Sequence, residues 1–169
     1  MYFFMRTQST LGKVAESAHA RSFGAAYVVL RLALGTLFLM AGWAKIGTGW
    51  SASSYLAVAT GPFAEFFRSL AGNSIIDLCN AWGLFLLGVA LIVGLLVRPA
   101  ALLGMVLMAL YYFAAFTANT AHGYVDEHVI YFCTLALFAA GGAGHVFGLN
   151  GVVLGNLRKT NALVRFLLG

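Results

Sequence analysis

Charged side chains are scarce in this sequence: only 9% of its 169 residues are Asp, Glu, Lys or Arg, and only five are acidic. A soluble domain needs such residues to cover its surface. This chain is 62% hydrophobic with a mean hydropathy of +0.90, so in water it would expose a large apolar surface even after its core was filled. The composition therefore excludes an ordinary soluble domain and indicates a protein surrounded by lipid.

Cysteines and cofactor motifs are also few. Cys79 and Cys133 lie inside separate apolar runs, which excludes a secreted disulfide framework. No flavin, nucleotide or iron–sulfur motif is present, and His128 and His145 would lie about 25 Å apart along one helix, too far apart to ligate one haem. We expect no haem, metal or nucleotide. The net charge of +5 comes from dispersed residues with no base-stacking motif, so we expect no nucleic acid partner.

Long apolar runs organise the chain. About 20 apolar residues cross a bilayer, and four segments approach or exceed that length. The sequence predicts an all-α membrane protein, a bundle of four transmembrane helices. The expected spans are Phe23–Lys45, Ile75–Val97, Pro99–Ala118 and Asp126–Gly148. Only Arg98 separates the second span from the third, which predicts a tight antiparallel hairpin with proline in the first turn of the third helix.

The distribution of basic residues predicts the orientation. With both termini in the cytoplasm, seven basic residues lie inside and two outside, as the positive-inside rule requires. The inside residues would be Arg6, Lys13, Arg21, Arg98, Arg158, Lys159 and Arg165, and the outside residues Lys45 and Arg68. We therefore expect a cytoplasmic tail over 1–22, a membrane domain over 23–149, a second cytoplasmic tail over 150–169, and residence in the inner membrane. In the second tail, Asn161–Gly169 is too short to span and is expected at the inner surface.

The first outer loop contains an amphipathic stretch, Pro62–Ala71. Helical spacing would gather its phenylalanines on one face and turn Glu65 and Arg68 away. This pattern predicts a short helix lying in the outer membrane interface. A lid packed on the bundle is equally consistent with it.

Arg31 is the most unusual residue of the spans, because it lies about 12 Å into the first helix. A guanidinium at that depth needs partners or water, or must extend back to the cytoplasmic headgroups. Arg31 shares a helical stripe with small and aromatic residues and with Lys45, and we expect this stripe to face the bundle interior. Its other members are Gly35, Phe38 and Gly42.

Asp77 admits two interpretations. The sequence SIID, Ser74 to Asp77, matches a capping box, which would make the aspartate a device for starting the helix. Asn80 lies on the same face one turn deeper, beyond what a cap requires. A role for Asp77 in lining a site therefore stays open.

The stretch GYVDEHVIYF places three ionisable groups at the start of the fourth span. Asp126 and Glu127 suit a helix N-terminus, where negative charge is favoured. His128 does not, because an imidazolium gains nothing there, so we expect a neutral histidine that accepts hydrogen bonds or transfers protons.

These groups share the outer membrane level with Lys45 and Asp77 in the predicted topology. A lysine and a histidine among carboxylates would bind a small anion and move protons. Both cysteines are expected to face away from this site. The aromatic residues at this level are expected as an interfacial belt: Trp43, Trp50, Trp82, Tyr111, Tyr112 and Tyr124.

Four segments in order carry a family resemblance: RLALGTLFLMAGWAKIGTGW, PFAEFFRSLAGNS, AWGLFLLGVALIVGLLVRPAALLG and YVDEHVIYF. Together they resemble the DoxX/DoxD-like family of small four-helix membrane proteins, closest to the DoxD-type subunit of thiosulfate:quinone oxidoreductase. The resemblance covers about Arg31 to Asn150. It implies oxidation of thiosulfate to tetrathionate on the outer side, with quinone as the electron acceptor.

The matched positions then become functional candidates: Arg31, Lys45, Arg98, Asp126, Glu127 and His128. On this reading Lys45 and His128 bind the anion, and Glu127 or His128 relays the protons. The small accessory domain of the thiosulfate enzyme is missing, so activity would need a second redox subunit. A homo-oligomer also stays open.

Two other function classes remain. The family includes redox-complex partners and assembly factors, so the alternative is a non-catalytic membrane scaffold or assembly subunit of a respiratory or redox complex. A small transporter has less support, because the chain shows no inverted repeat and few polar groups near the bilayer centre.

Overall fold

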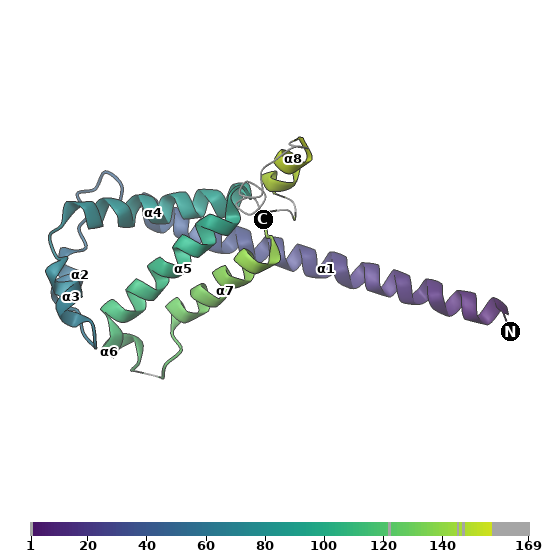
Figure 1. Ribbon diagram of the computed structural model, residues 1–169, viewed down its shortest axis with the longest axis horizontal. Coiled ribbons are helices and arrows are strands. Elements are labelled where there is room, and N and C mark those ends of the chain that lie inside the picture. The colour runs from purple at the N-terminus through teal and green to yellow at the C-terminus, as the bar shows by residue number, and fades with distance from the viewer. Residues whose placement is uncertain (1, 122, 145, 147, 157–169) are drawn as a thin grey trace.

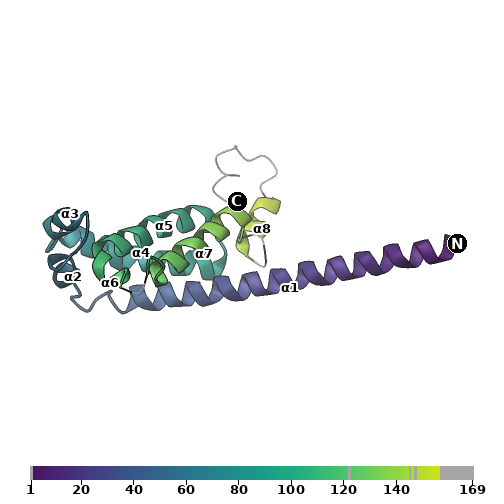
Figure 2. The ribbon, with the colours of Figure 1, turned by 90° about the horizontal axis from the view of Figure 1, so that it is seen from below.

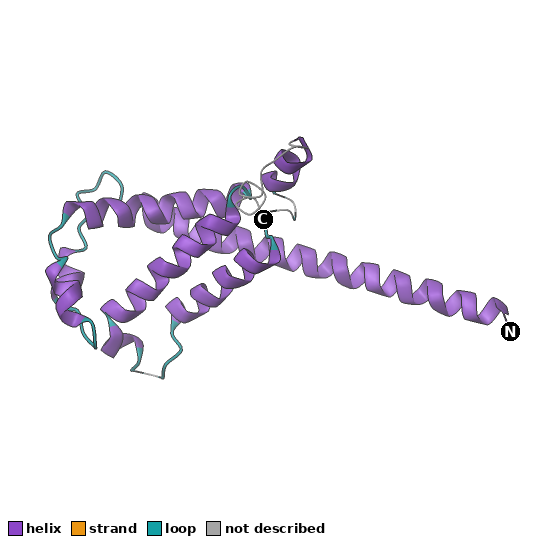
Figure 3. Ribbon diagram, viewed as in Figure 1, coloured by secondary structure: helices purple, strands orange, loops and turns teal. Residues whose placement is uncertain are grey.

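The computed structural model describes residues 2–121, 123–144, 146 and 148–156, with side chains described from residue 21 to residue 152 within those ranges. Every regular element in this part of the chain is a helix, and the only strand-like feature is an isolated bridge between Thr60 and Ala115 (Figure 3). The helices are α1 (Tyr2–Trp43), α2 (Ser53–Ala57), α3 (Ala64–Ser69), α4 (Ser74–Val93), α5 (Val97–Ala114), α6 (Phe116–Asn119), α7 (Glu127–Gly141) and α8 (Leu149–Asn156). The all-helical prediction is confirmed for these residues.

Three helices are long and apolar enough to cross a bilayer: Arg21–Trp43 within α1, Ser74–Val93 (α4) and Val97–Ala114 (α5). These segments identify a multi-pass membrane protein. The fourth apolar helix, α7, has 15 residues, because Gly142 takes a left-handed backbone with φ of 60° and ends it before the predicted boundary. Whether α7 spans the membrane, and with it the location of both termini in the cytoplasm, stays a prediction.

The bundle is built from two closely packed helix pairs, α1 with α4 and α5 with α7. Gly42 of α1 and Gly88 of α4 allow the first pair to approach closely. A Cβ on Gly88 would come within 2.6 Å of Leu39 Cα, and one on Gly42 within 2.7 Å of Phe85 Cα. Small residues at such contacts are typical of membrane helix packing. Phe38, Leu91, Leu135 and other apolar side chains fill the interior between the pairs.

The turn between α4 and α5 lies slightly earlier than predicted. Gly94 ends α4 with φ of 71°, and Leu96 also has positive φ, so the chain reverses before Arg98. Val97 begins α5, which leaves Pro99 in the first turn of the helix, where its missing N–H costs no hydrogen bond. The predicted hairpin is present, and α4 and α5 contact each other along it.

Two short helices, α2 and α3, cover one end of the bundle, and we call residues 50–72 the lid (Figure 1). Leu56 and Phe67 are buried in a small apolar cluster with Ala114 of α5. Phe63 and Phe66 are about half exposed, at 50% and 55%. The loop therefore packs on the bundle as a lid, which was one of the two alternatives. The location of this loop in the membrane interface stays a prediction.

The N-terminal segment predicted as a tail continues α1 as one helix. At 1.5 Å per residue its 42 residues reach about 63 Å, and both views show α1 running well past the other helices (Figures 1 and 2). At the C-terminal side α8 begins beside the end of the bundle opposite the lid. The predicted surface segment Asn161–Gly169 lies outside the described residues.

Candidate functional site

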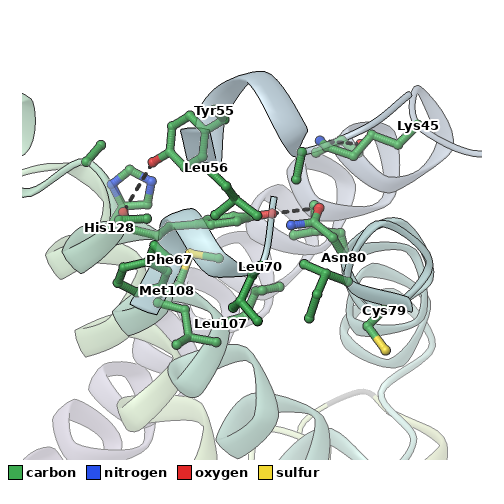
Figure 4. A pocket seen from close by; sticks show the side chains of 18 of the residues that line it. Lys45, Tyr55, Leu56, Phe67, Leu70, Cys79, Asn80, Leu107, Met108 and His128 are labelled. Carbon is green, nitrogen blue, oxygen red and sulfur yellow. Dashed lines mark hydrogen bonds between the residues drawn. The ribbon is translucent and has the colours of Figure 1, made fainter. Parts of the chain in front are cut away.

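A cavity of about 940 Å³ lies at the lid end of the bundle. Its walls are formed by the lid helices α2 and α3, by the short helix α6, and by the ends of α1, α4, α5 and α7. The lining is mainly apolar, as is usual for sites that take organic ligands. Its polar and ionisable groups include Lys45, Tyr55, Asn80, Tyr111, Glu127 and His128. Figure 4 labels four of them: Lys45, Tyr55, Asn80 and His128.

Asp126 and His128 form a pair at the start of α7. The Asp126 carboxylate caps the helix by accepting from Val129 N at 3.1 Å, and its other oxygen lies 2.6 Å from His128 Nδ1. Since a carboxylate only accepts, Nδ1 carries the proton and donates it. This leaves Nε2 to accept or release a proton, which is the arrangement a general base needs.

The ionisation of Asp126 is compatible with this pairing. Burial alone would raise the pKa of its carboxyl, but hydrogen bonds from His128 and from the Val129 backbone outweigh burial and lower the pKa below its ordinary value. Asp126 therefore remains negative at neutral pH. It fixes the tautomer of His128 and the orientation of the ring.

Tyr111 of α5 connects this pair with α4. Its ring meets the His128 ring edge to face at 5.7 Å between centroids, and its hydroxyl donates to Asn80 Oδ1 at 2.8 Å. The polar residues of three different helices thus follow one another along one wall of the cavity. Asn80 was predicted only as a companion of Asp77, and Tyr111 only as a member of an aromatic belt.

Lys45 lies at another part of the cavity wall, in the turn after α1. Its Nζ donates to Ala41 O at 3.0 Å and lies 5.0 Å from the centre of the Trp50 ring. Burial lowers the pKa of the Lys45 ammonium below its ordinary value. Among the described residues that line the cavity, no other lysine or arginine is present, and no carboxylate forms an ion pair with Lys45. Its charge is therefore balanced by a carbonyl and a ring rather than by an anion.

Asp77 serves the lid rather than the cavity lining. Its Oδ1 accepts from Ala52 N at 2.8 Å, which joins α4 to the lid. The capping-box interpretation is wrong, because Asn73 is the N-cap and its side chain accepts from Ile75 N at 2.9 Å. Asp77 does not border the cavity, whereas Glu127 borders it with an exposed side chain.

Arg31 lies at the opposite end of the bundle. It is 1% exposed, which confirms that its stripe faces the interior, and it does not extend outward to a surface. Its Nη1 donates to Ala143 O and, at 3.0 Å, to Val146 O, just beyond the end of α7. Arg98 donates from Nε to Ala139 O at 3.0 Å, so both arginines bind carbonyls at the C-terminal end of α7. The structure thus separates Arg31 from Lys45 and His128, with which it was named as a functional candidate.

The lid contributes a residue that sequence reasoning missed. Tyr55 of α2 donates from its hydroxyl to Tyr111 O at 3.2 Å, and burial followed by the charge of Asp126 raises the pKa of its phenol. The signal was weak, because a single tyrosine in a loop carries no spacing pattern. Cys79 also borders the cavity, against the expectation that it faces away, although its side chain is exposed.

In the described part of the chain, no three His, Cys, Asp or Glu side chains lie close enough together to hold a metal ion. In a comparison with protein families, the family model for DoxX matches residues 26–119. That range is more than half of the chain and includes Lys45, Tyr55, Asn80 and Tyr111. Neither a curated protein nor a solved structure matches the sequence.

Proposed function

Because the chain belongs to the DoxX family, we propose that it is a redox-linked membrane subunit of the thiosulfate:quinone oxidoreductase type, in which a quinone is reduced at the lid-end cavity. The observation that carries this proposal is the Asp126–His128 pair beside an apolar cavity of about 940 Å³. A quinone is an apolar ring with carbonyl oxygens that must gain protons. Apolar walls with a proton-transferring histidine fit that chemistry.

The proposed reaction balances with two protons. Two thiosulfate ions join through a new S–S bond to give tetrathionate and release two electrons. The quinone takes up these two electrons and two protons and leaves as quinol. His128 would deliver protons from Nε2 and recover them from the aqueous side, while Asp126 holds the ring in position through Nδ1.

Lys45 would attract the anionic substrate. Its ammonium lies in an apolar setting with no carboxylate partner among the described residues, so an oxyanion would gain more there than at an exposed lysine. Most of the cavity lining is apolar and does not suit the charged thiosulfate ion; Lys45 is the cation in that lining. We therefore assign the anion to the Lys45 region and the quinone to the wall formed by Asn80, Tyr111 and His128.

The test is thiosulfate-dependent reduction of a short-chain quinone by the purified protein in proteoliposomes, alone and with candidate accessory subunits. Activity should fall in the His128→Gln variant and persist in Thr134→Val, which changes a polar residue of the same helix outside the cavity. Absence of quinone reduction in every combination, with all variants equal, would reject the proposal.

A scaffold or assembly function is the second candidate, and the length of α1 favours it. A helix of about 63 Å extends past the bundle and offers a surface to partner proteins (Figure 2). Here a stable partner should be captured with the full chain, its level should fall when the protein is absent, and the His128→Gln variant should support the partner as well as the wild type does.

A further inference from the structure

Asn80 is a buried amide within the membrane-spanning part of α4. It is 9% exposed and lies two turns inside the helix. Polar side chains are costly in such segments and usually serve packing between helices or a ligand. Asn80 borders the cavity, so a ligand there would contact it.

Tyr111 fixes the direction of this amide. Because its hydroxyl donates to Asn80 Oδ1 at 2.8 Å, the acceptor side of the amide is occupied and the Nδ2 group is turned away from Tyr111. Among the described residues, none accepts a hydrogen bond from Nδ2. Figure 4 shows Asn80 beside the cavity, on the same side of the view as Lys45 and across from His128.

We propose that Asn80 Nδ2 is a hydrogen-bond donor for a carbonyl oxygen of a lipophilic ring, and that the Asn80–Tyr111 pair determines which headgroups the cavity accepts. The inference rests on the proposed function and names the wall that holds the quinone headgroup. Tyr111 contacts His128 through its ring and Asn80 through its hydroxyl, so the donor and the proton-transfer group flank one tyrosine.

The chemistry of the amide favours a neutral headgroup. Asn80 carries no charge, and its neighbours on this wall are the apolar side chains Leu84, Leu107 and Met108. An anion bonded to the Asn80 amide would lose hydration and gain only a neutral donor from this residue. A quinone carbonyl loses little on leaving water and gains one directed hydrogen bond. A donor of this kind contributes to affinity and position rather than to proton transfer.

The experiment uses a short-chain benzoquinone labelled with ¹³C at one carbonyl and bound to the full-length protein in proteoliposomes. Difference infrared spectra report hydrogen bonding at the labelled carbonyl, and titration gives the Kd. In the wild type the carbonyl band should lie below its position in protein-free lipid. In Asn80→Leu the band should return toward the free position and the Kd should rise about tenfold.

Two further variants keep the result interpretable. Tyr111→Phe leaves Asn80 in place but frees its amide to turn, so the carbonyl band should broaden and the Kd should rise about threefold. This variant decides the matter if Asn80→Leu does not fold. Thr134→Val, outside the cavity, should match the wild type in both readouts.

The outcomes separate the two proposals. A wild-type protein that binds no quinone would overturn both the quinone site and the role of Asn80. Normal binding with an unchanged band and Kd in folded Asn80→Leu, or in Tyr111→Phe if the first variant does not fold, would overturn the role of Asn80 alone. A band that shifts in Asn80→Leu but not in Thr134→Val supports the proposal.

Discussion

Arg31 and His128 lie at opposite ends of the helical bundle, and they meet the cost of burial in different ways. Arg31 binds backbone carbonyls at the end of α7, in a place where Gly94 and Gly148 bring the chain too close for any side chain. A Cβ on Gly94 would lie 3.1 Å from Arg31 Nη1. His128 instead pairs with another side chain and faces a cavity.

The difference is between polar groups held in closed packing and polar groups that face a cavity. At the Arg31 end the packing is closed, and the hydrogen bonds involve the main chain. The Asn150 side chain accepts from Leu96 N, and the Asn150 backbone N–H donates to Gly94 O. At the lid end two pairs of side chains, Asp126 with His128 and Tyr111 with Asn80, lie beside open volume. Closed packing on backbone acceptors therefore points to a structural role for Arg31, and side-chain pairs beside a cavity point to a candidate site.

The largest effect on stability is expected from the Arg31→Leu variant. The variant leaves the carbonyls of Ala143 and Val146 without this donor, so the free energy of unfolding should fall by about 2–4 kcal/mol, measured by SDS titration in mixed micelles. Arg21→Gln, at an exposed position of α1, should cost about 0.5 kcal/mol or less. If Arg31→Leu were stable but inactive, Arg31 would have a functional role, and the contrast drawn between Arg31 and His128 would be wrong.

His128→Gln should give the opposite pattern. Loss of the proton-transferring imidazole should lower the rate of quinone reduction about 100-fold, with unfolding changed by about 1 kcal/mol or less. Steady-state kinetics in proteoliposomes and the same SDS titration measure both quantities. A variant that loses stability but keeps its rate per folded molecule would assign His128 to structure.

Lys45→Met should weaken the binding of the anion more than the binding of the quinone. The KM for thiosulfate should rise about tenfold, because the variant removes the cation but keeps an apolar stem, while quinone Kd stays the same. Burial lowers the pKa of Lys45, so the wild type should lose anion affinity as pH rises through that lowered value, earlier than an exposed lysine would. A pH-independent KM up to the ordinary lysine range would contradict this role.

Asp126→Asn should have the smallest effect on stability and change its pH dependence. The folded-state pKa of Asp126 is lowered, so its contribution is complete above the ordinary Asp pKa of 3.8 and is lost as pH falls through the lowered value. Asparagine still caps α7 but cannot be protonated there, so the acid loss of melting temperature should be smaller in the variant. Thermal unfolding between about pH 3 and pH 7 measures the difference.

Much of the architecture could be predicted from the sequence, because apolar run length is a direct consequence of the bilayer. The boundaries were less accurate where single backbone conformations decide them, as at Gly142, which shortens α7. The Asp126, Glu127 and His128 cluster was recognised because a histidine conflicts with a helix N-terminus.

The rest depended on tertiary contacts that no periodicity encodes. Arg31 and Lys45 share one helical stripe, yet about 20 Å of helix separates them, and only the packing of α7 shows that the arginine has backbone acceptors. The partnership of Asn80 with Tyr111 joins helices α4 and α5, and the link from Asp77 to Ala52 crosses from α4 to a loop.

The shortness of α7 has a consequence for the surrounding lipid. Its 15 residues reach about 22 Å, whereas the hydrocarbon layer is about 30 Å thick and the neighbouring α5 is long enough to cross it. If α7 crosses the bilayer as predicted, the acyl chains beside it must compress, or the polar loop before Asp126 must sit below the headgroups of the adjoining leaflet. Either adjustment would bring interfacial water closer to His128 from the side, and under the proposed function the local thickness of the membrane would then affect how protons reach the cavity.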